Sequence, residues 1–142
     1  MAMTRAEKVK WLRGVSLFSG LGPRALGAVA DRAEVIEFPA GRYIVRQGQI
    51  GTGFYLIVAG RARVIRGSET LNTLGPGDFF GELSVLDQSP RMAHVLTEEP
   101  TTCLALASWE FTKLLEKNPK VTLQIMREVV HRLRSTSEQH RH

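Results

Sequence analysis

Residues 53–66 read Gly-Phe-Tyr-Leu-Ile-Val-Ala-Gly-Arg-Ala-Arg-Val-Ile-Arg, two short runs joined at a glycine. The first run, 53–58, is apolar enough for a strand that is covered on both faces. The second run, 61–66, alternates polar and apolar side chains, as a half-buried strand does. Because β-branched and aromatic residues dominate both runs, the stretch predicts short antiparallel strands.

Glycines continue this rhythm in both directions from residues 53–66. Between Val35 and Leu106 the apolar runs are separated by Gly41, Gly48, Gly51, Gly53, Gly60, Gly67, Gly75 and Gly77. Many short strands with turn residues between them indicate a rolled sheet or barrel. The expected fold is therefore mainly β, with a jelly-roll-like antiparallel β-roll over about residues 33–107.

Helices are predicted before the strands, over about residues 4–32. Thr4 is placed to cap a first helix that runs to about Arg13, and Pro23 opens a second helix. One face of this second helix is apolar and carries Leu26, Val29 and Ala30.

Two more helices are predicted after the strands, over about residues 108–136. Ser108 precedes a short helix that stops near Asn118 and Pro119, and a last helix follows from Lys120. Apolar residues recur along the last helix at spacings of three and four, at Leu123, Met126, Val130 and Leu133. This continuous apolar stripe needs a partner.

The composition fits one folded domain over residues 1–142. Of the 142 residues, 43% are hydrophobic and 23% are charged, which is enough to bury one core. No segment has the apolar length of a membrane span, and residues 1–13 are too charged for a signal peptide. A cytoplasmic location is expected. The one cysteine, Cys103, suits a reducing compartment, and its apolar strand predicts inert packing.

The net charge of +5 and the isoelectric point near 9.9 raise the question of nucleic-acid binding. Lysine and arginine are spread through every predicted element, and no basic run is interleaved with aromatic residues as a strand-binding surface requires. A solvated basic surface is the better interpretation, so no direct nucleic-acid binding is expected.

Rolled β-sheets also host metal-dependent oxygenases and isomerases, which need clustered ligands. The four histidines are His94, His131, His140 and His142, and no two of them fall on neighbouring strand positions with a carboxylate nearby. The sequence therefore predicts no metal site and no catalytic residues.

Residues 80–95 carry the candidate binding site and read Phe-Gly-Glu-Leu-Ser-Val-Leu-Asp-Gln-Ser-Pro-Arg-Met-Ala-His-Val. Gly81 allows close approach of a backbone to a ligand, and Glu82 offers an acceptor that suits a ribose hydroxyl. Arg91 supplies a planar fork of donors that matches the free oxygens of a phosphate. Residues between them begin as a short helix, whose free amides would face the same phosphate.

This segment resembles the phosphate-binding cassette of the cyclic nucleotide-binding domain family, of the catabolite activator protein and protein kinase A regulatory subunit type. Residues 37–48 resemble the family's first hairpin, 54–64 its central strands, and 74–80 the lead into the cassette. The likeness covers roughly residues 15–135.

The resemblance implies a role for each cassette residue. Glu82 would accept a hydrogen bond from the ribose 2′-hydroxyl, and Arg91 would bind the cyclic phosphate. Backbone amides around the phosphate would come from Gly81, Leu83 and Ser84. The implied ligand is cAMP or cGMP, and no further cofactor is implied.

The residues after Arg91 bear on ligand preference. Ala93 matches the family as the small residue that lets the next strand pass the ligand. Met92 stands where the family usually has Ala, Ser or Thr, and His94 where Thr or Ser is common. Because a hydroxyl after the arginine is associated with guanine preference, the resemblance favours cAMP over cGMP, and Met92 narrows the pocket.

The implied function is that of a regulatory sensor whose last helices move when the ligand binds. Leu133 or a neighbour is a candidate lid over the base, and the stripe around it is also a candidate homodimer contact. Transcription factors built on this sensor carry a helix-turn-helix after the last long helix, whereas about ten residues follow Leu133. The alternatives are a degenerate fold that acts as a protein interaction module, or the sensor part of a larger transcription regulator or channel.

Overall fold

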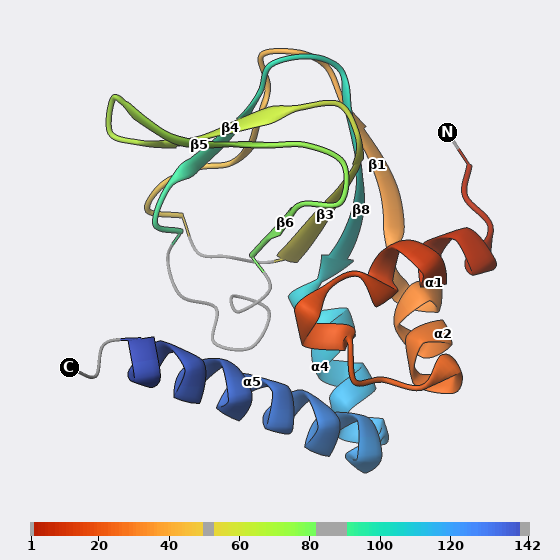
Figure 1. The fold of residues 1–142 in the computed structure, drawn as a ribbon. Coiled ribbons are helices and arrows are strands. Elements are labelled where there is room, and N and C mark those ends of the chain that lie inside the picture. The colour runs from red at the N-terminus through yellow and green to blue at the C-terminus, as the bar shows by residue number, and fades with distance from the viewer. Residues whose placement is uncertain (1, 50–52, 82–90, 140–142) are drawn as a thin grey trace.

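The computed structural model describes residues 2–49, 53–81 and 91–139, and Figure 1 labels its elements. The helices before the strands are α1 (Arg5–Arg13), the short 3-10 helix η1 (Ser16–Phe18) and α2 (Pro23–Arg32). The strands are β1 (Glu34–Phe38), β2 (Tyr43–Val45), β3 (Gly53–Ala59), β4 (Ala62–Arg66), β5 (Glu69–Leu74), β6 (Phe79–Phe80), β7 (His94–Thr97) and β8 (Thr101–Ala107). The helices after the strands are α4 (Ser108–Lys117) and α5 (Pro119–Gln139).

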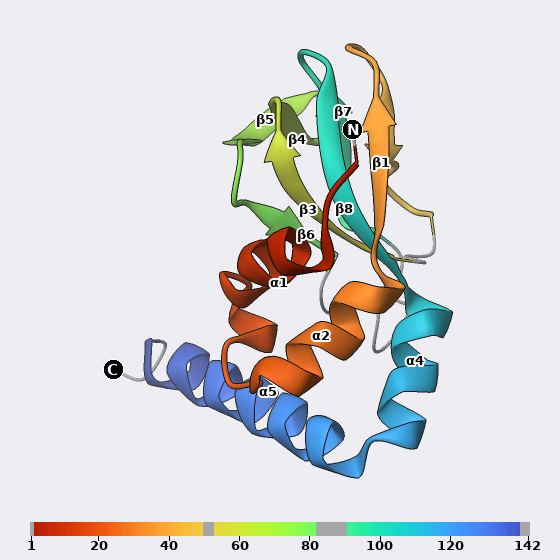
Figure 2. The same ribbon diagram turned by 90° about the vertical axis from the view of Figure 1, so that its right-hand side faces the viewer.

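The described residues form two four-stranded antiparallel sheets. One sheet has the strand order β1-β8-β3-β6 and the other the order β2-β7-β4-β5. The helices gather at one end of the sheets, below them in both views (Figures 1 and 2). This arrangement confirms the predicted fold class of antiparallel strands with flanking helices, although the described strands make two sheets and not one closed barrel.

Residues 37–48, predicted as a hairpin, turn a corner between the sheets. β1 pairs with β8 in one sheet, whereas β2 pairs with β7 in the other. At the corner, Gly41 has a φ of +74° and its N–H donates to the Thr97 carbonyl at 2.9 Å. The hairpin prediction is wrong because a tight turn looks the same in sequence whether the flanking strands pair with each other or with distant strands.

Strands β3 and β8 are covered on both faces, as the apolar run 53–58 predicts. Alternate residues point to opposite faces of the sheet. The face toward the helices supplies Phe54, Leu56, Leu104 and Leu106 to the larger core. The other face places Ile57 and Cys103 in a second core between the two sheets. Burial raises the pKa of the Cys103 thiol to about 12, so the predicted inert packing of this cysteine is confirmed.

Aromatic side chains join the helices to the sheet in the larger core. The Phe18 ring of η1 meets Phe54 of β3 and Phe111 of α4 edge-on, with centroid separations of 5.7 and 5.9 Å. All three rings are fully buried, and burial of one such side chain stabilises a fold by about 1.5–3 kcal/mol. The helices are therefore fixed to the sheet by packing.

The predicted start of α1 is confirmed in detail. The Thr4 hydroxyl accepts a hydrogen bond from the Glu7 N–H at 3.2 Å, and the Thr4 N–H donates to the Glu7 carboxylate at 3.3 Å. This reciprocal pair is a capping box, which satisfies two amides that the first helical turn cannot.

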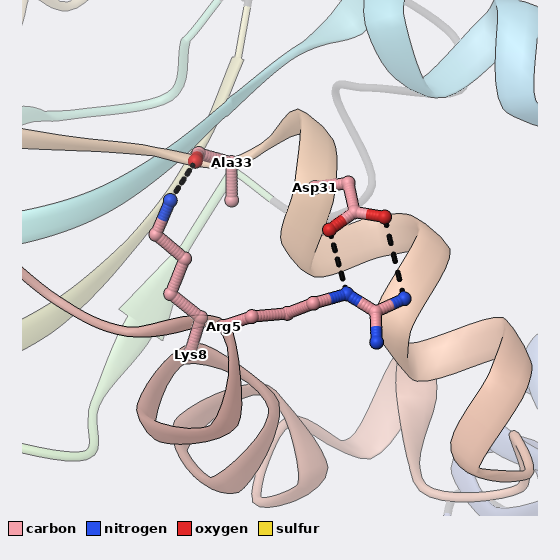
Figure 3. Close-up of polar contacts among 4 residues, drawn as sticks. All are labelled: Arg5, Lys8, Asp31 and Ala33. Atoms are coloured by element: carbon pink, nitrogen blue, oxygen red, sulfur yellow. Dashed lines mark hydrogen bonds and ion pairs between the residues drawn. The ribbon is translucent and has the colours of Figure 1, made fainter.

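Polar contacts tie α1 to α2 and to the start of β1 (Figure 3). Arg5 donates to both carboxylate oxygens of Asp31, at 2.7 and 3.3 Å, and lowers the pKa of that carboxyl. Lys8 donates to the Ala33 carbonyl at 2.9 Å, at the point where α2 ends. These contacts hold α1 to α2 and to the residue before β1.

The C-terminal helices differ from their predicted form in two respects. Ser108 is the first residue of α4 and Ala107 occupies the capping position without a side-chain bond, so the predicted serine cap is wrong. α5 packs through Val121 and Ile125, which lie in the larger core. The predicted stripe, in contrast, is exposed: Leu123 by 47%, Met126 by 58%, Val130 by 47% and Leu133 by 64%. Two apolar faces therefore run along one helix.

Candidate functional site

The two ends of the cassette, Gly81 and Arg91, lie beside strands of different sheets. Gly81 directly follows β6 at the edge of one sheet, and Arg91 precedes β7 in the other. The predicted ligand residues Glu82, Leu83 and Ser84 lie outside the described residues. The geometry of the site is therefore that of its two ends and of the strands around them.

Arg91 is a buried cation whose side chain and main chain are both held. Its side chain is 9% exposed, and Nη2 donates to the Gly53 carbonyl at the start of β3. Its main-chain N–H donates to the Gln49 carbonyl at 2.7 Å, and its carbonyl accepts from the Gly48 N–H at 2.9 Å. A guanidinium withdrawn from water requires such partners, since an unpaired buried charge is strongly destabilising.

Gly81 makes room for the Arg91 guanidinium. Its φ is +80°, in the left-handed region that favours glycine. A Cβ at this position would lie 2.7 Å from the Gly53 carbonyl oxygen and would overlap the guanidinium. Gly53, Gly81 and Arg91 therefore meet at one point between the ends of β3 and β6.

Tyr55 also belongs to this region, although the sequence did not single it out. It pairs with Phe80 in the β3–β6 ladder, and the two rings stack at 5.3 Å with an interplanar angle of 19°. Burial raises the pKa of the Tyr55 phenol, while the positive charge of Arg91 acts in the opposite direction. The phenol is thus neutral near pH 7 and close enough to Arg91 to sense its charge. The sequence does carry a signal for this position. Tyr55 lies between Phe54 and Leu56, which face the helices, so its side chain points to the opposite face of the sheet.

The residues after Arg91 point in different directions. Met92 is 73% exposed, and Ala93 is half-buried. His94 opens β7 and is half-buried; its neighbour Val95 enters the core between the sheets, so the imidazole lies on the outer face. Of the predicted ligand residues in the described chain, Gly81 and Arg91 are brought into contact, whereas Met92 faces solvent.

Leu133, the predicted base lid, lies near the far end of α5 and is 64% exposed. In both views α5 lies below the sheets, at the end of the molecule where the other helices also lie (Figures 1 and 2). The described geometry therefore shows Leu133 as a surface residue on an exposed apolar stripe.

A groove of about 670 Å³ opens beside the site. Gly53 and Tyr55 line one part of it, and Arg32, Trp109 and Glu110 line another. Arg32 and Glu110 form an ion pair across it at 3.2 Å. Within the described ranges, no group of three or more His, Cys, Asp or Glu side chains lies close enough to hold a metal ion. No helix in the described part of the chain combines the length and apolar character needed to cross a membrane.

The cyclic nucleotide-binding domain model matches residues 35–118, which is more than half of the chain. This range includes Gly81, Arg91 and every described strand, apart from the first residue of β1. The chain therefore belongs to the cyclic nucleotide-binding domain family. The cyclic nucleotide-binding domains of such regulatory proteins are generally non-enzymatic sensors.

Individual relatives agree with this assignment. The cyclic AMP receptor protein of Thermus thermophilus is 34% identical over 128 residues, which is 87% of this chain and 59% of that protein. The cGMP-dependent protein kinase, isozyme 1, of Drosophila melanogaster is 36% identical over 117 residues, 77% of this chain and 15% of that protein. The chain spans about three fifths of the length of the first relative and a small part of the second.

A solved structure shows the same fold. The N-terminal domain of a transcriptional regulator from Streptomyces coelicolor A3(2) superposes with a TM-score of 0.85 at 26% sequence identity. The match covers 90% of this chain and 95% of that domain. The two-sheet architecture with flanking helices is thus that of the family.

The contact between Gly81 and Arg91 predicts a position-specific cost of adding a methyl group. Gly81→Ala and Gly41→Ala both place alanine at a φ near +75 to +80°, but a Cβ at Gly41 meets no atom within 4 Å. The left-handed conformation costs both variants about 1–2 kcal/mol. The overlap with Gly53 and Arg91 adds about 1–3 kcal/mol for Gly81→Ala alone. Urea unfolding measures the difference, and equal losses in the two variants would contradict the close packing at Gly81.

Proposed function

We propose that this chain is a sensor that binds a cyclic nucleotide, cAMP in preference to cGMP, and catalyses no reaction on it. The observation that carries the proposal is the buried guanidinium of Arg91, held against Gly53 and Gly81 at the two ends of the cassette. A planar guanidinium matches two oxygens of a phosphodiester, and its charge is maintained at any physiological pH.

The other cassette residues complete the proposed site. Glu82 accepts a hydrogen bond from the ribose 2′-hydroxyl, and backbone amides of Gly81, Leu83 and Ser84 surround the phosphate. Ala93 leaves space for the ligand beside β7. The support for these roles is the order and spacing of the residues in the sequence, together with membership of the family.

Met92 is the residue on which the proposed cAMP preference depends. It follows Arg91 directly and brings no hydroxyl that could bond to a guanine base. Relatives of the chain include a cyclic AMP receptor protein and a cGMP-dependent kinase, so membership of the family is compatible with either nucleotide.

Ligand binding would add a phosphate to the partners of Arg91. Nη2 donates to the Gly53 carbonyl in the described geometry, and a hydrogen bond to an anion is roughly twice as strong as one to a neutral carbonyl. A bound phosphate would therefore favour a rearrangement around Gly53 and β6. We infer that α4 and α5 respond to it, because they pack on the same sheet through the larger core.

The exposed stripe of α5, residues Leu123, Met126, Val130 and Leu133, is the proposed output surface. Four large apolar side chains on one face of a 21-residue helix favour association with a second apolar surface. We propose that this surface pairs with a second copy of the chain, and that Leu133 serves as the base lid when the ligand is bound.

Two alternatives concern the context of the domain. The chain covers 59% of the cyclic AMP receptor protein, which is consistent with the sensor part of a larger transcription regulator or channel. A degenerate fold that serves only for protein interaction would keep the exposed stripe of α5 but would not bind a cyclic nucleotide. The measurement below separates this second alternative from the sensor.

Cyclic nucleotide binding is predicted to depend on Arg91. Millimolar cAMP should raise the melting temperature of the wild-type protein, because a ligand that binds only the folded state stabilises it. In calorimetry, Arg91→Ala should lose about 2–4 kcal/mol of binding free energy, roughly thirty-fold to several-hundred-fold in affinity. Arg66→Ala, which removes the same charge from an exposed strand end, is the matched control and should bind as the wild type does.

The outcomes separate the proposals. If neither cAMP nor cGMP shifts the melting temperature of the wild type, the chain is not a cyclic nucleotide sensor. If wild-type binding survives unchanged in a folded Arg91→Ala variant, the nucleotide binds elsewhere.

Nucleotide preference is predicted to shift with Met92→Thr. The added hydroxyl can bond to a guanine base, and one neutral hydrogen bond is worth about 1 kcal/mol, or roughly fivefold in affinity. Competition titrations of wild type and variant give the ratio of cGMP to cAMP affinity, which should rise. Because Met92 is 73% exposed, the substitution leaves the core intact, and an unaltered ratio would show that this position does not set the preference.

A charged residue in the stripe should report on both proposed roles of α5. Leu133→Asp is predicted to move sedimenting wild-type dimer toward monomer and to weaken cAMP binding several-fold, since a charge cannot cover an apolar base face at low cost. Thr112→Asp, at an exposed position of α4, is the control. A variant that sediments and binds like the wild type would exclude Leu133 from both roles.

A further inference from the structure

The loop between β2 and residue 50 holds the main chain of Arg91 from both sides. The Gly48 N–H donates to the Arg91 carbonyl at 2.9 Å, and the Gln49 carbonyl accepts from the Arg91 N–H at 2.7 Å. The Gln49 N–H donates back to the Arg46 carbonyl at 3.2 Å, which closes a turn. The position of this loop therefore fixes the Arg91 main chain, from which the guanidinium side chain extends.

Gln47, in the middle of that turn, is fixed by two contacts from other parts of the fold. Its main-chain N–H donates to Nδ1 of His94 at 3.0 Å. Its side-chain carbonyl accepts from the Gly67 N–H, in the turn between β4 and β5, at 3.0 Å. The imidazole of His94 is thus one of two anchors that hold the Arg91 loop on the outer face of the second sheet.

The contact with Gln47 depends on the protonation state of His94. A neutral imidazole with its proton on Nε2 presents a lone pair at Nδ1 and can accept the Gln47 N–H. A protonated imidazole carries hydrogen on both nitrogens. Its Nδ1–H would then face the main-chain N–H of Gln47, and two donors cannot form a hydrogen bond with each other. The bond exists in the neutral form and is lost in the cation.

We propose that His94 is a positioning residue for Arg91, and that protonation of His94 releases the Gln47 anchor and weakens cyclic nucleotide binding. This inference rests on the proposed function for its ligand. A released loop leaves the Arg91 main chain less ordered, and the ligand must then restore that order at the expense of affinity.

The titratable and charged groups around His94 come from β2, from β4 and from the residues that follow β2 and β7. On β2, the Tyr43 ring lies 5.2 Å from the imidazole. The guanidinium of Arg46, the residue after β2, lies 4.5 Å from the centre of the Tyr43 ring. On β4, Ile65 is directly opposite His94. The next outward residue of β4, Arg63, pairs at 3.2 Å with Glu98, which follows β7. Arginine, tyrosine and a paired glutamate ordinarily keep their charge between about pH 5.5 and 8, whereas histidine does not.

Two substitutions of His94 separate the hydrogen bond from the charge. His94→Asn keeps an acceptor close to the position of Nδ1 but does not titrate. His94→Leu removes the acceptor at every pH. His131→Asn is the matched control, because His131 is an exposed histidine on α5.

The experiment is cAMP titration by calorimetry at pH 7.5, 6.5 and 5.5 for the wild type and the three variants. Wild type and His131→Asn should lose about three- to tenfold in affinity between pH 7.5 and 5.5, the equivalent of about one hydrogen bond. The cAMP affinity of His94→Asn should equal that of the wild type at pH 7.5 and should not change between pH 7.5 and 5.5. His94→Leu should bind about three- to tenfold more weakly at every pH. A wild-type profile without pH dependence, or the same decline in His94→Asn, would overturn the inference.

A measurement without nucleotide keeps this inference distinct from the proposed function. Amide hydrogen exchange in the free protein reports protection of the Gln47, Gly48 and Arg91 amides. Protection factors of the wild type should fall between pH 7.5 and 5.5, while those of His94→Asn should not. If they do so in a protein that binds no cyclic nucleotide, the anchoring by His94 stands and the proposed function fails. If they do not fall in the wild type, the anchoring itself is wrong.

Discussion

The pairing of β3 with β8 is the constraint on which the rest of the structure depends. Both strands are covered on two faces, so their large apolar side chains are divided between two cores. Phe54 and Leu56 point to the helices, which fixes Tyr55 and Ile57 toward the other sheet. The same register places the Gly53 carbonyl at the start of β3, where it accepts a hydrogen bond from the guanidinium of Arg91. Core packing and the geometry of the candidate site are therefore set by one ladder.

The site combines groups that are far apart in sequence and have different tasks. Arg91 supplies charge, Gly81 supplies space, and the loop of Gly48 and Gln49 supplies the position of the Arg91 main chain. A buried cation is destabilising unless its surroundings are arranged for it. Here the Gly53 carbonyl accepts from the guanidinium, and the Gly48–Gln49 loop holds the Arg91 main chain.

Much of the fold follows from local sequence, because local patterns decide which residues can form each element. The capping box at Thr4, the doubly covered strand β3 and the inert Cys103 are of this kind. What the sequence did not reveal depends on distant pairing. The corner at Gly41, the neighbourhood of Tyr55 and the bond from Gln47 to His94 each follow from the strand order of the two sheets. On α5, the periodicity of the sequence identified one apolar face, which is exposed. Only the packing shows that a different face, with Val121 and Ile125, is buried in the larger core.

The burial of Cys103 has a practical consequence for measuring the position of α5. It is the only cysteine in the sequence, and its thiol, with a pKa of about 12, stays protonated and closed to reagents in the folded protein. A cysteine introduced at an exposed position such as Met126 would then be the single reactive thiol. Fluorescent or spin labels can therefore be attached to α5 while the native core is kept, and the angle of this helix to the sheets becomes directly observable.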